Sequence, residues 1–217
     1  MKFTCTKTEL LRGIGIVIKA AYVKYQRSIL ECIHIKAEGS RLLLDTFDMV
    51  TAIKTSVYAQ VEEEGETAIP ARVLFETVNK FPEEEIVFKR EGTVLKLSGQ
   101  RSDVDLIEMD AEQFPRFPEL NGKKVAMSKA DLKDMIEATA FSAYVGDDRP
   151  IFTGLLFEAS REKGTLSIVG IDGIRLAKNT IRLSVAEDVK AVIPAKTMKD
   201  VSRILSEGEE EVNLYFS

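Results

Sequence analysis

The chain is poor in the residues that mark several common classes of protein. Its 217 residues include only two cysteines and one histidine. Cys5 and Cys32 lie 27 residues apart with no second pair. This spacing excludes a disulfide framework and zinc sites of the usual spacing. We expect two reduced, half-buried thiols.

Long apolar runs are also missing. No stretch is long enough to cross a bilayer, and the N-terminal MKFTCTKTEL has neither an apolar core nor a small-residue cleavage site. The pattern therefore predicts a cytoplasmic protein that makes no membrane contact.

Catalytic motifs are scarce. His34 alternates with Ile33 and Ile35, so we expect it on the opposite face of a strand, at the surface or an edge, with no serine or cysteine partner indicated. The stretch GIGIVI from Gly13 has Ile18 in the third glycine place of a dinucleotide motif and lies inside a helical pattern. No cofactor is expected.

Two aspartates occupy similar places in the two halves of the chain. Asp48 and Asp172 each end a predicted strand before a turn, where aspartate commonly bonds its own backbone. The alternative is a pair of metal carboxylates in a metal-dependent nucleic-acid enzyme. The spacing supplies no third ligand, so the sequence favours the turn and predicts no metal site.

An internal repeat is the most informative feature. Five blocks recur in the same order, shifted by 122 to 126 residues: TKTEL with SKADL, SILECIHIKA with PIFTGLLFEA, LLLDTFD with LSIVGID, IPAR with IPAK, and PEEEIVFK with GEEEVNLY. A period of this size is a domain's length, which indicates a duplicated domain. Pro115, Pro118 and the Asn121-Gly122 turn signal then mark a junction, giving domains 1–121 and 122–217.

The second copy is the shorter one. It lacks about 29 residues that correspond to GTVLKLSGQRSDVDLIEMD, which alternates like two strands. An apolar strand such as EVNLYFS would leave an unpaired edge at the end of a natural domain. We therefore expect a truncated second domain.

The local patterns predict an α+β fold. Each copy reads strand, helix, three strands, short strand, helix, then strands, which favours helices on one side of an antiparallel sheet. In the first copy Leu10, Ile14, Val17 and Ala21 share one helical face. Leu74, Val78 and Phe81 share another, and in the second copy Leu132 with Ile136, and Val201 with Leu205, repeat the pattern.

Positive charge is concentrated on these helices. The chain has a net charge of -5, yet the four helical segments 7–27, 71–80, 129–141 and 195–205 sum to +6 and the rest of the chain to -11. Opposite the apolar faces lie Arg12 and Lys19, then Arg72, and then Lys196, Lys199 and Arg203. A solvated helix face commonly carries such residues, but a shared positive surface also suits a phosphate backbone without sequence readout.

Several motifs resemble one family. MKFT, IPAR before a helix, the block RPIFTGLLFE from Arg149, DGIRLA and VIPAK are together similar to the bacterial DNA polymerase III beta subunit, the replicative sliding clamp. The resemblance implies the DNA-clamp fold and a non-catalytic processivity factor. It further implies three copies of one fold per chain, of which the third is absent here, and a homodimeric ring around duplex DNA.

The resemblance also implies sites and partners. DNA proximity is implied for Lys24 and Arg149, while Arg72, Lys196, Lys199 and Arg203 follow from the helical wheel. The expected partners are the replicative polymerase, the clamp loader and other proteins with a short clamp-binding motif. The second domain's half of the implied peptide cleft is made of Phe152, Gly173, Ile174, Arg175 and Leu176.

Two departures from the family pattern accompany this resemblance. Ile174 stands where a histidine is usual, and QRSIL replaces the usual leucine-proline before Ile29.

A protein-binding scaffold that never meets DNA also fits the cleft; it would tolerate charge reversal at Lys24, Lys199 and Arg203.

Overall fold

The computed structural model describes residues 1–21, 29–117, 121–205 and 210–217. It divides the chain into two compact units, unit 1 (Met1–Phe117) and unit 2 (Pro118–Ser217), and each is described by itself. Within the described ranges, no helix is both long and apolar enough to cross a membrane.

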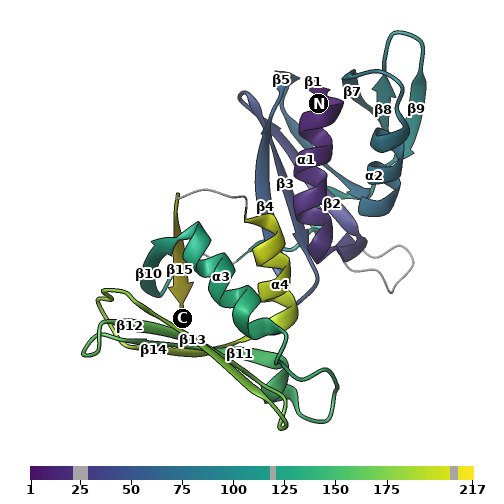
Figure 1. The fold of residues 1–217 in the computed structure, drawn as a ribbon. Helices are drawn as coiled ribbons and strands as arrows, with labels where there is room; N and C mark the ends of the chain where they lie inside the picture. Colours follow the sequence, from purple (N-terminus) through teal and green to yellow (C-terminus); the bar gives the residue numbers. More distant parts are fainter. Residues whose placement is uncertain (22–28, 118–120, 206–209) are drawn as a thin grey trace. The chain divides into compact units, whose positions relative to one another are not determined.

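Unit 1 is a layer of two helices on antiparallel sheet (Figure 1). Its elements are β1 (Lys2–Thr6), α1 (Lys7–Val17), β2 (Cys32–Glu38), β3 (Arg41–Phe47), β4 (Ala52–Tyr58), β5 (Gln60–Glu63), β6 (Gly65–Pro70), α2 (Ala71–Lys80), β7 (Glu85–Glu91), β8 (Val94–Ser98) and β9 (Asp103–Ile107). The strands form one sheet in the order β5-β1-β7-β8-β9 and a second in the order β4-β3-β2-β6. Helices α1 and α2 contact each other; α1 lies on β3 and β4, and α2 on β6.

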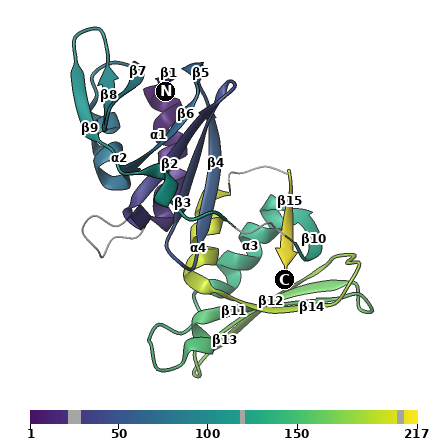
Figure 2. The ribbon, with the colours of Figure 1, turned by 180° about the vertical axis from the view of Figure 1, so that it is seen from behind.

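Unit 2 repeats this arrangement with fewer strands. Its elements are β10 (Lys123–Ser128), α3 (Lys129–Ala140), β11 (Gly154–Ser160), β12 (Thr165–Ile171), β13 (Leu176–Arg182), β14 (Val189–Pro194), α4 (Ala195–Ile204) and β15 (Glu211–Phe216). Strands β10 and β15 pair, and a four-stranded sheet has the order β13-β12-β11-β14. Helices α3 and α4 pack together on one face of that sheet, as the views from opposite sides show (Figures 1 and 2).

The two units pair their strands in the same register: residues that correspond under the shifts of the sequence repeat also face each other in the sheets. In unit 1 Thr6 faces Glu85, and in unit 2 the corresponding residues Ser128 and Glu211 face each other. The pairs β2–β3, β2–β6 and β3–β4 agree in the same way with β11–β12, β11–β14 and β12–β13. The predicted α+β class and the duplicated, antiparallel architecture are thus confirmed.

Helix α1 shows why the apolar periodicity was informative and where it misled. Leu10, Ile14 and Val17 are fully buried as predicted, because they share the face that lies on the sheet. The prediction for Ala21 is wrong: Ala20 is the fully buried residue, and Ala21 is only partly buried. Residues after Val17 tighten into a 3₁₀ turn, which has fewer residues per turn than an α-helix and moves the buried face back along the chain.

Two strand predictions have different outcomes in unit 1. The alternating segment after residue 92 forms the two predicted strands, β8 and β9. Between the helices, however, the described residues of unit 1 form five strands instead of the predicted four, because the polar segment Gln60–Glu63 pairs with β1 as β5. Unit 2 has the predicted four strands between its helices.

His34 departs from its predicted surface position. Its side chain does lie on the opposite face of β2 from Ile33 and Ile35, which are buried. Yet only 12% of the histidine side chain is exposed, and the ring of Phe114 stacks on it. Alternation within a strand gives the face, but not whether a later segment covers that face.

Candidate nucleic-acid interface and partner cleft

Helix α4 carries the densest group of the predicted DNA residues. Lys196, Lys199 and Arg203 line one groove of about 350 Å³, which Tyr144 and Thr153 also line. The side chain of Arg203 is 68% exposed and its Nη1 lies 3.4 Å from Oδ1 of Asp200. The three cations therefore face one space large enough to admit a phosphate group.

The packing of α4 sets how far each cation reaches. Ala195 and Met198 are the apolar residues of α4 buried against the core, whereas the predicted core residues Val201 and Leu205 are only partly buried. This rotation of the helix leaves Lys199 half-buried, while Lys196 and Arg203 are exposed. The predicted cationic face is present, but Lys199 at its centre lies closer to the protein surface than Lys196 and Arg203 do.

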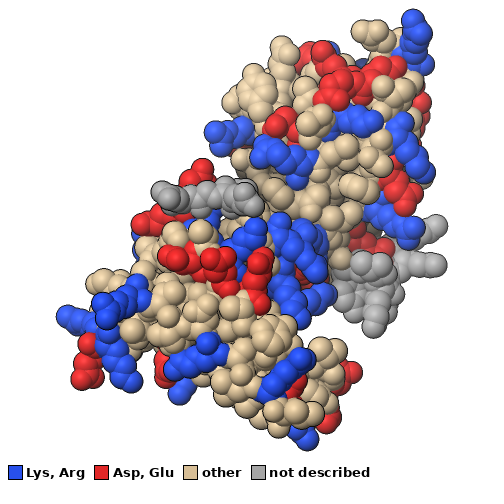
Figure 3. Space-filling view, viewed as in Figure 1, with Lys and Arg blue, Asp and Glu red and all other residues tan. Residues whose placement is uncertain are grey.

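The two helices of unit 2 differ in charge. In Figure 3 blue lysine and arginine side chains gather over α4, and red acidic side chains lie over α3. This matches the sequence, in which segment 195–205 carries a net charge of +2 and segment 129–141 carries -1. A phosphate backbone is therefore attracted to α4 more than to α3.

Arg72 projects from the exposed face of α2. Its side chain is 85% exposed, and its Nε donates a hydrogen bond of 2.9 Å to Oε1 of Glu76. This hydrogen bond raises the pKa of Arg72 and lowers the pKa of Glu76. Leu74, on the opposite face, is fully buried, as the helical wheel predicts. Another predicted DNA residue, Lys24, lies outside the described residues.

Four of the residues assigned to the partner cleft, Gly173 to Leu176, follow Asp172 at one tight turn between β12 and β13, whereas Phe152 lies in the 3₁₀ turn Pro150–Thr153. Oδ1 of Asp172 accepts hydrogen bonds of 2.9 Å from the backbone N–H groups of Ile174 and Arg175. The guanidinium Nε of Arg175 donates to Oδ2 of Asp172 at 2.8 Å. These bonds, the two backbone ones above all, hold the pKa of Asp172 below its usual range. The carboxylate thus fixes the turn from which the cleft residues project.

Apolar side chains at this turn and beside Phe152 are open to solvent. Ile174 is 98% exposed and Leu176 is 61% exposed. Phe141, whose ring lies 5.7 Å beneath the guanidinium of Arg175, and Ile151, next to the predicted cleft residue Phe152, are also exposed. Large apolar side chains grouped on a surface, with an arginine at their edge, are typical of a protein-interaction site.

Arg149 lies between the two candidate sites. Its guanidinium lies 5.9 Å from the ring centre of Tyr144, which lines the α4 groove. Its Nη1 also lies close to Gly173, where an added Cβ would come within 3.1 Å of it. The residue assigned to DNA therefore contacts the turn of the predicted partner cleft as well.

Comparisons with known proteins cover both units. Residues 1–118 match the model of the DNA polymerase III beta subunit, N-terminal domain, and residues 126–217 match that of the central domain of the same subunit. The chain belongs to the DNA polymerase III beta subunit family. The two matched domains lie one after the other along the chain, as the two copies of the internal repeat do.

Relatives and solved structures of this family align over nearly the whole chain. The beta sliding clamp of Halalkalibacterium halodurans is 28% identical over 99% of this chain and 60% of its own length. A putative DNA polymerase III beta subunit from Eubacterium rectale has a TM-score of 0.92 and 29% identity, covering 100% of this chain and 60% of its own. The Pseudomonas aeruginosa sliding clamp bound to griselimycin has a TM-score of 0.92 and 26% identity, covering 99% and 59%. The chain thus spans about 60% of the length of these relatives.

Asp48 and Asp172, the two aspartates considered as metal carboxylates, each hold a backbone turn. Oδ1 of Asp48 accepts from the backbone N–H groups of Val50 and Thr51, as Oδ1 of Asp172 does in its own turn. The prediction that each bonds its own backbone is confirmed. Among the residues that the structure describes, no cluster of three potential metal ligands is found.

Sequence reasoning missed the aromatic residues that join the two candidate sites. Phe141 ends α3 and Tyr144 follows it, and both contact an arginine of the candidate sites. The available signal was the apolar character of FSAYV after the helical pattern had ended. Nothing in that stretch, however, indicates that Arg149 and Arg175 pack on these rings.

Proposed function

We propose that this chain is part of a processivity factor, a sliding clamp that encircles duplex DNA without sequence preference during DNA replication. On this proposal it is a non-catalytic subunit that tethers the replicative polymerase, the clamp loader and other proteins carrying a clamp-binding motif. The observation that carries the proposal is the duplicated clamp-family fold with its exposed cations on helices α2 and α4.

The cationic surface supports weak and exchangeable DNA contacts. Arg72 and Arg203 are largely exposed, and each already has an acidic neighbour on its own helix. Exposed pairs of this kind are weak, so a phosphate can replace the carboxylate at little cost. A protein held on DNA by topology needs this kind of affinity, because stronger contacts would stop it from sliding.

The turn at Asp172 supports a peptide-binding role. Ile174 and Leu176 offer apolar surface, and the rigid turn presents them with little loss of conformational entropy on binding. The Pseudomonas aeruginosa relative was solved bound to griselimycin. We infer that the surface around this turn is one half of a cleft that binds short apolar peptide motifs.

Ring closure needs a third copy of the fold, which we infer for a full-length form of the chain that dimerises. In the described part of the chain β9 pairs only with β8, so its outer edge is open, and Ile107 at its end is 79% exposed. An open edge with an exposed apolar residue is suited to pairing with another chain. We expect that residues 1–217 alone do not close a ring.

Retention on circular DNA tests the clamp proposal. The experiment compares residues 1–217 with a chain extended at its C-terminus by a third copy of the repeat, using light scattering and retention on circular plasmid. The extended chain should dimerise and stay on the plasmid until it is linearised, whereas residues 1–217 should bind weakly and in a salt-sensitive manner. Equal binding of the extended chain to linear and circular DNA would contradict a ring.

Charge reversal separates the clamp from a scaffold that never meets DNA. The variant Lys199→Glu with Arg203→Glu should lose DNA retention, because the α4 groove becomes acidic. The matched control is Lys163→Glu with Lys190→Glu, which makes the same change in net charge on residues that line a different groove. Equal retention by both double variants would favour the scaffold.

A further inference from the structure

The unit 2 sheet carries a cationic groove on its outer face, the face opposite α3 and α4. In β11 the side chain of Phe157 is buried toward the helices, whereas Glu158 is exposed on the other face, because side chains alternate along a strand. A groove of about 600 Å³ lies on this outer face. The charged residues that line it are four lysines and two acidic residues: Lys123, Lys163, Lys178, Lys190, Glu158 and Asp188. A chain with a net charge of -5 thus has a groove with a net charge of +2.

Three of these lysines have no counter-ion. Lys163, Lys178 and Lys190 are exposed, and within the part of the chain that the structure describes their Nζ atoms make no ion pair and no hydrogen bond. Lys123 differs, because its Nζ donates to the backbone carbonyl of Asp188 at 2.8 Å. Like charges around one groove repel one another, so an anion that enters the groove relieves that repulsion.

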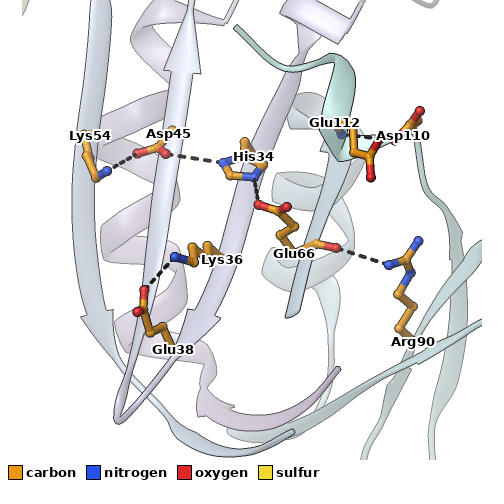
Figure 4. Close-up of polar contacts among 9 residues, drawn as sticks. All are labelled: His34, Lys36, Glu38, Asp45, Lys54, Glu66, Arg90, Asp110 and Glu112. Atoms are coloured by element: carbon orange, nitrogen blue, oxygen red, sulfur yellow. Dashed lines mark hydrogen bonds and ion pairs between the residues drawn. The ribbon is translucent and has the colours of Figure 1, made fainter. Parts of the chain in front are cut away.

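The corresponding face of unit 1 has its lysines paired (Figure 4). There Nζ of Lys36 lies 2.8 Å from Oε2 of Glu38, and Nζ of Lys54 lies 3.9 Å from Oδ1 of Asp45. A cavity of about 710 Å³ on that face is lined by His34 and by equal numbers of other cations and carboxylates: Lys36, Lys54, Arg116, Asp45, Glu66 and Glu112. Its lysines and arginine are therefore matched by carboxylates.

The repeat shows where the two faces differ. Lys54 of β4 faces an aspartate across the sheet, whereas its counterpart Lys178 of β13 faces Val169 of β12. In the next row Lys190 of β14 takes the place of the carboxylate Glu66 of β6. Both differences leave positive charge without a partner. The cationic groove is therefore a property of unit 2 and not a requirement of the fold.

The floor of the groove offers hydrogen-bonding groups between the lysines. The hydroxyl oxygens of Ser167 in β12 and Thr180 in β13 lie 2.8 Å apart in a shared hydrogen bond, and Ser160 and Thr165 line the same groove. Glu158, on the central strand β11, makes no side-chain hydrogen bond or ion pair to any described residue. The groove therefore suits a ligand that brings carboxylates for the lysines and N–H donors for this glutamate.

These features favour an acidic peptide over a DNA backbone. An extended peptide carries both carboxylates and backbone N–H donors. A DNA backbone has phosphate acceptors but no donor, so it would place anionic oxygens beside Glu158 and Asp188. The sheet order β13-β12-β11-β14 gives three steps between strands, or about 14 Å, which an extended segment of roughly four residues crosses.

We propose that this groove is a docking site for an acidic, extended segment of a partner protein. The groove shares no lining residue with the α4 groove or with the turn at Asp172. A partner held on the outer face therefore leaves both candidate sites open. The inference rests on the charges of the unit 2 sheet and does not depend on the function proposed above.

Fluorescence anisotropy of a labelled peptide tests the proposal on residues 1–217. The probe is a peptide of roughly ten residues that alternates glutamate and serine, so that its carboxylates share one face of an extended chain. The matched probe has glutamine in place of glutamate. The acidic probe should bind at low salt and be released as salt rises, and the glutamine probe should bind roughly tenfold more weakly. Equal binding of the two probes, or no binding of the acidic probe at low salt, would overturn the proposal.

A pair of charge-reversal variants locates the bound probe. Lys163→Glu with Lys190→Glu should weaken binding of the acidic probe roughly tenfold, and both positions are exposed, so the chain should stay folded by circular dichroism. The matched control is Arg41→Glu with Arg101→Glu, which makes the same change in net charge at exposed positions of unit 1 and should bind the probe as the native chain does. Equal weakening in both double variants would mean that the probe responds to net charge alone, and the proposed site would be wrong.

Two other occupants are outcomes of the same experiments. If Lys163→Glu with Lys190→Glu loses retention on plasmid, the groove meets a phosphate backbone and the peptide proposal fails. In unit 1, segment 111–117 lines the outer-face cavity through Glu112 and Phe114, and in the chain extended by a third copy of the repeat the corresponding segment would follow residue 217. The extended chain should bind the acidic probe as well as residues 1–217 do. Binding by residues 1–217 alone would show that the chain's own continuation fills the groove, which also overturns the proposal.

Discussion

The two units build the same turn and place different side chains on it. In each unit an aspartate, Asp48 or Asp172, accepts two backbone N–H bonds from the residues that follow. The next residue has positive φ in both turns, 73° at Met49 and 94° at Gly173. Both turns expose apolar residues, Met49 and Val50 in unit 1 and Ile174 and Leu176 in unit 2, but in unit 2 an arginine, Arg175, also bonds the aspartate. The backbone of the repeat is kept, while the side chains that a partner would meet have diverged.

A second difference lies where the first helix of each unit meets its sheet. In unit 1 the hydroxyl of Thr46 donates to the carbonyl of Val17 at 2.5 Å. In unit 2 the corresponding strand residue is Gly170, and a Cβ there would lie 2.4 Å from the carbonyl of Thr139. One unit holds its helix by a hydrogen bond and the other by close approach of backbone. These contrasts can be tested one at a time.

The largest expected effect is on thiol reactivity, because unit 1 holds both cysteines. Burial is the main reason that the pKa of Cys5 is raised to about 11 and that of Cys32 to about 12. At pH 8 we expect labelling by a maleimide to be at least about 100-fold slower in the folded chain than in denaturant. Native labelling at the unfolded rate would contradict this. Since unit 2 has no thiol, the slow rate also reports the opening of unit 1 alone.

Gly170→Ala should give the largest loss of stability. The new methyl group meets a backbone carbonyl that cannot move without shifting α3, so we expect a loss of about 2–3 kcal/mol in the free energy of unfolding of unit 2. Urea denaturation followed by circular dichroism measures it. The matched control is Gly15→Ala on α1, where nothing lies within 4 Å of the added Cβ, and which should stabilise unit 1 slightly.

Thr46→Val should cost less and act on unit 1. The change keeps the side-chain shape but removes the donor to the buried carbonyl of Val17, so about 1–2 kcal/mol of unfolding free energy should be lost. Faster labelling of Cys5 and Cys32 would place the loss in unit 1. A variant as stable as the native chain would mean that the hydrogen bond is not the reason for threonine at this position.

Met49→Gly should have the smallest effect and the opposite sign. A non-glycine residue in the left-handed region costs roughly 1–2 kcal/mol, part of which glycine loses again through its greater freedom in the unfolded chain. We expect a gain of about 0.5 kcal/mol in the unfolding free energy of unit 1, measured by urea denaturation. A loss of stability would show that the exposed Met49 side chain makes a contribution beyond the backbone of its turn.

Much of the fold follows from the sequence because the repeat made two copies available for comparison. The shared shifts give the strand registers, and the position of each aspartate before a turn gives its hydrogen bonds. What failed depends on geometry that no local pattern records. The 3₁₀ turn moves burial from Ala21 to Ala20, and a distant segment covers His34.

The candidate sites were predicted in part. The helical wheel correctly places Arg72, Lys196 and Arg203 on exposed faces, because burial of the opposite face fixes the orientation of each helix. It does not predict that Lys199 is half-buried, since the sheet selects Ala195 and Met198 as the contact face. Whether these residues meet DNA stays a prediction.

The aspartate-locked turn leaves most of the side chains at its tip free of a role in holding the fold. In both units the frame is built mainly from a carboxylate and backbone amides, and in unit 2 the side chain of Arg175 adds one bond to the same aspartate. New side chains can then be placed there by single substitutions at little cost in foldability, except at the position of Met49 and Gly173, where the positive φ favours glycine. Grafting Gly173 to Leu176 onto the turn of unit 1 would give the same chain a second display site.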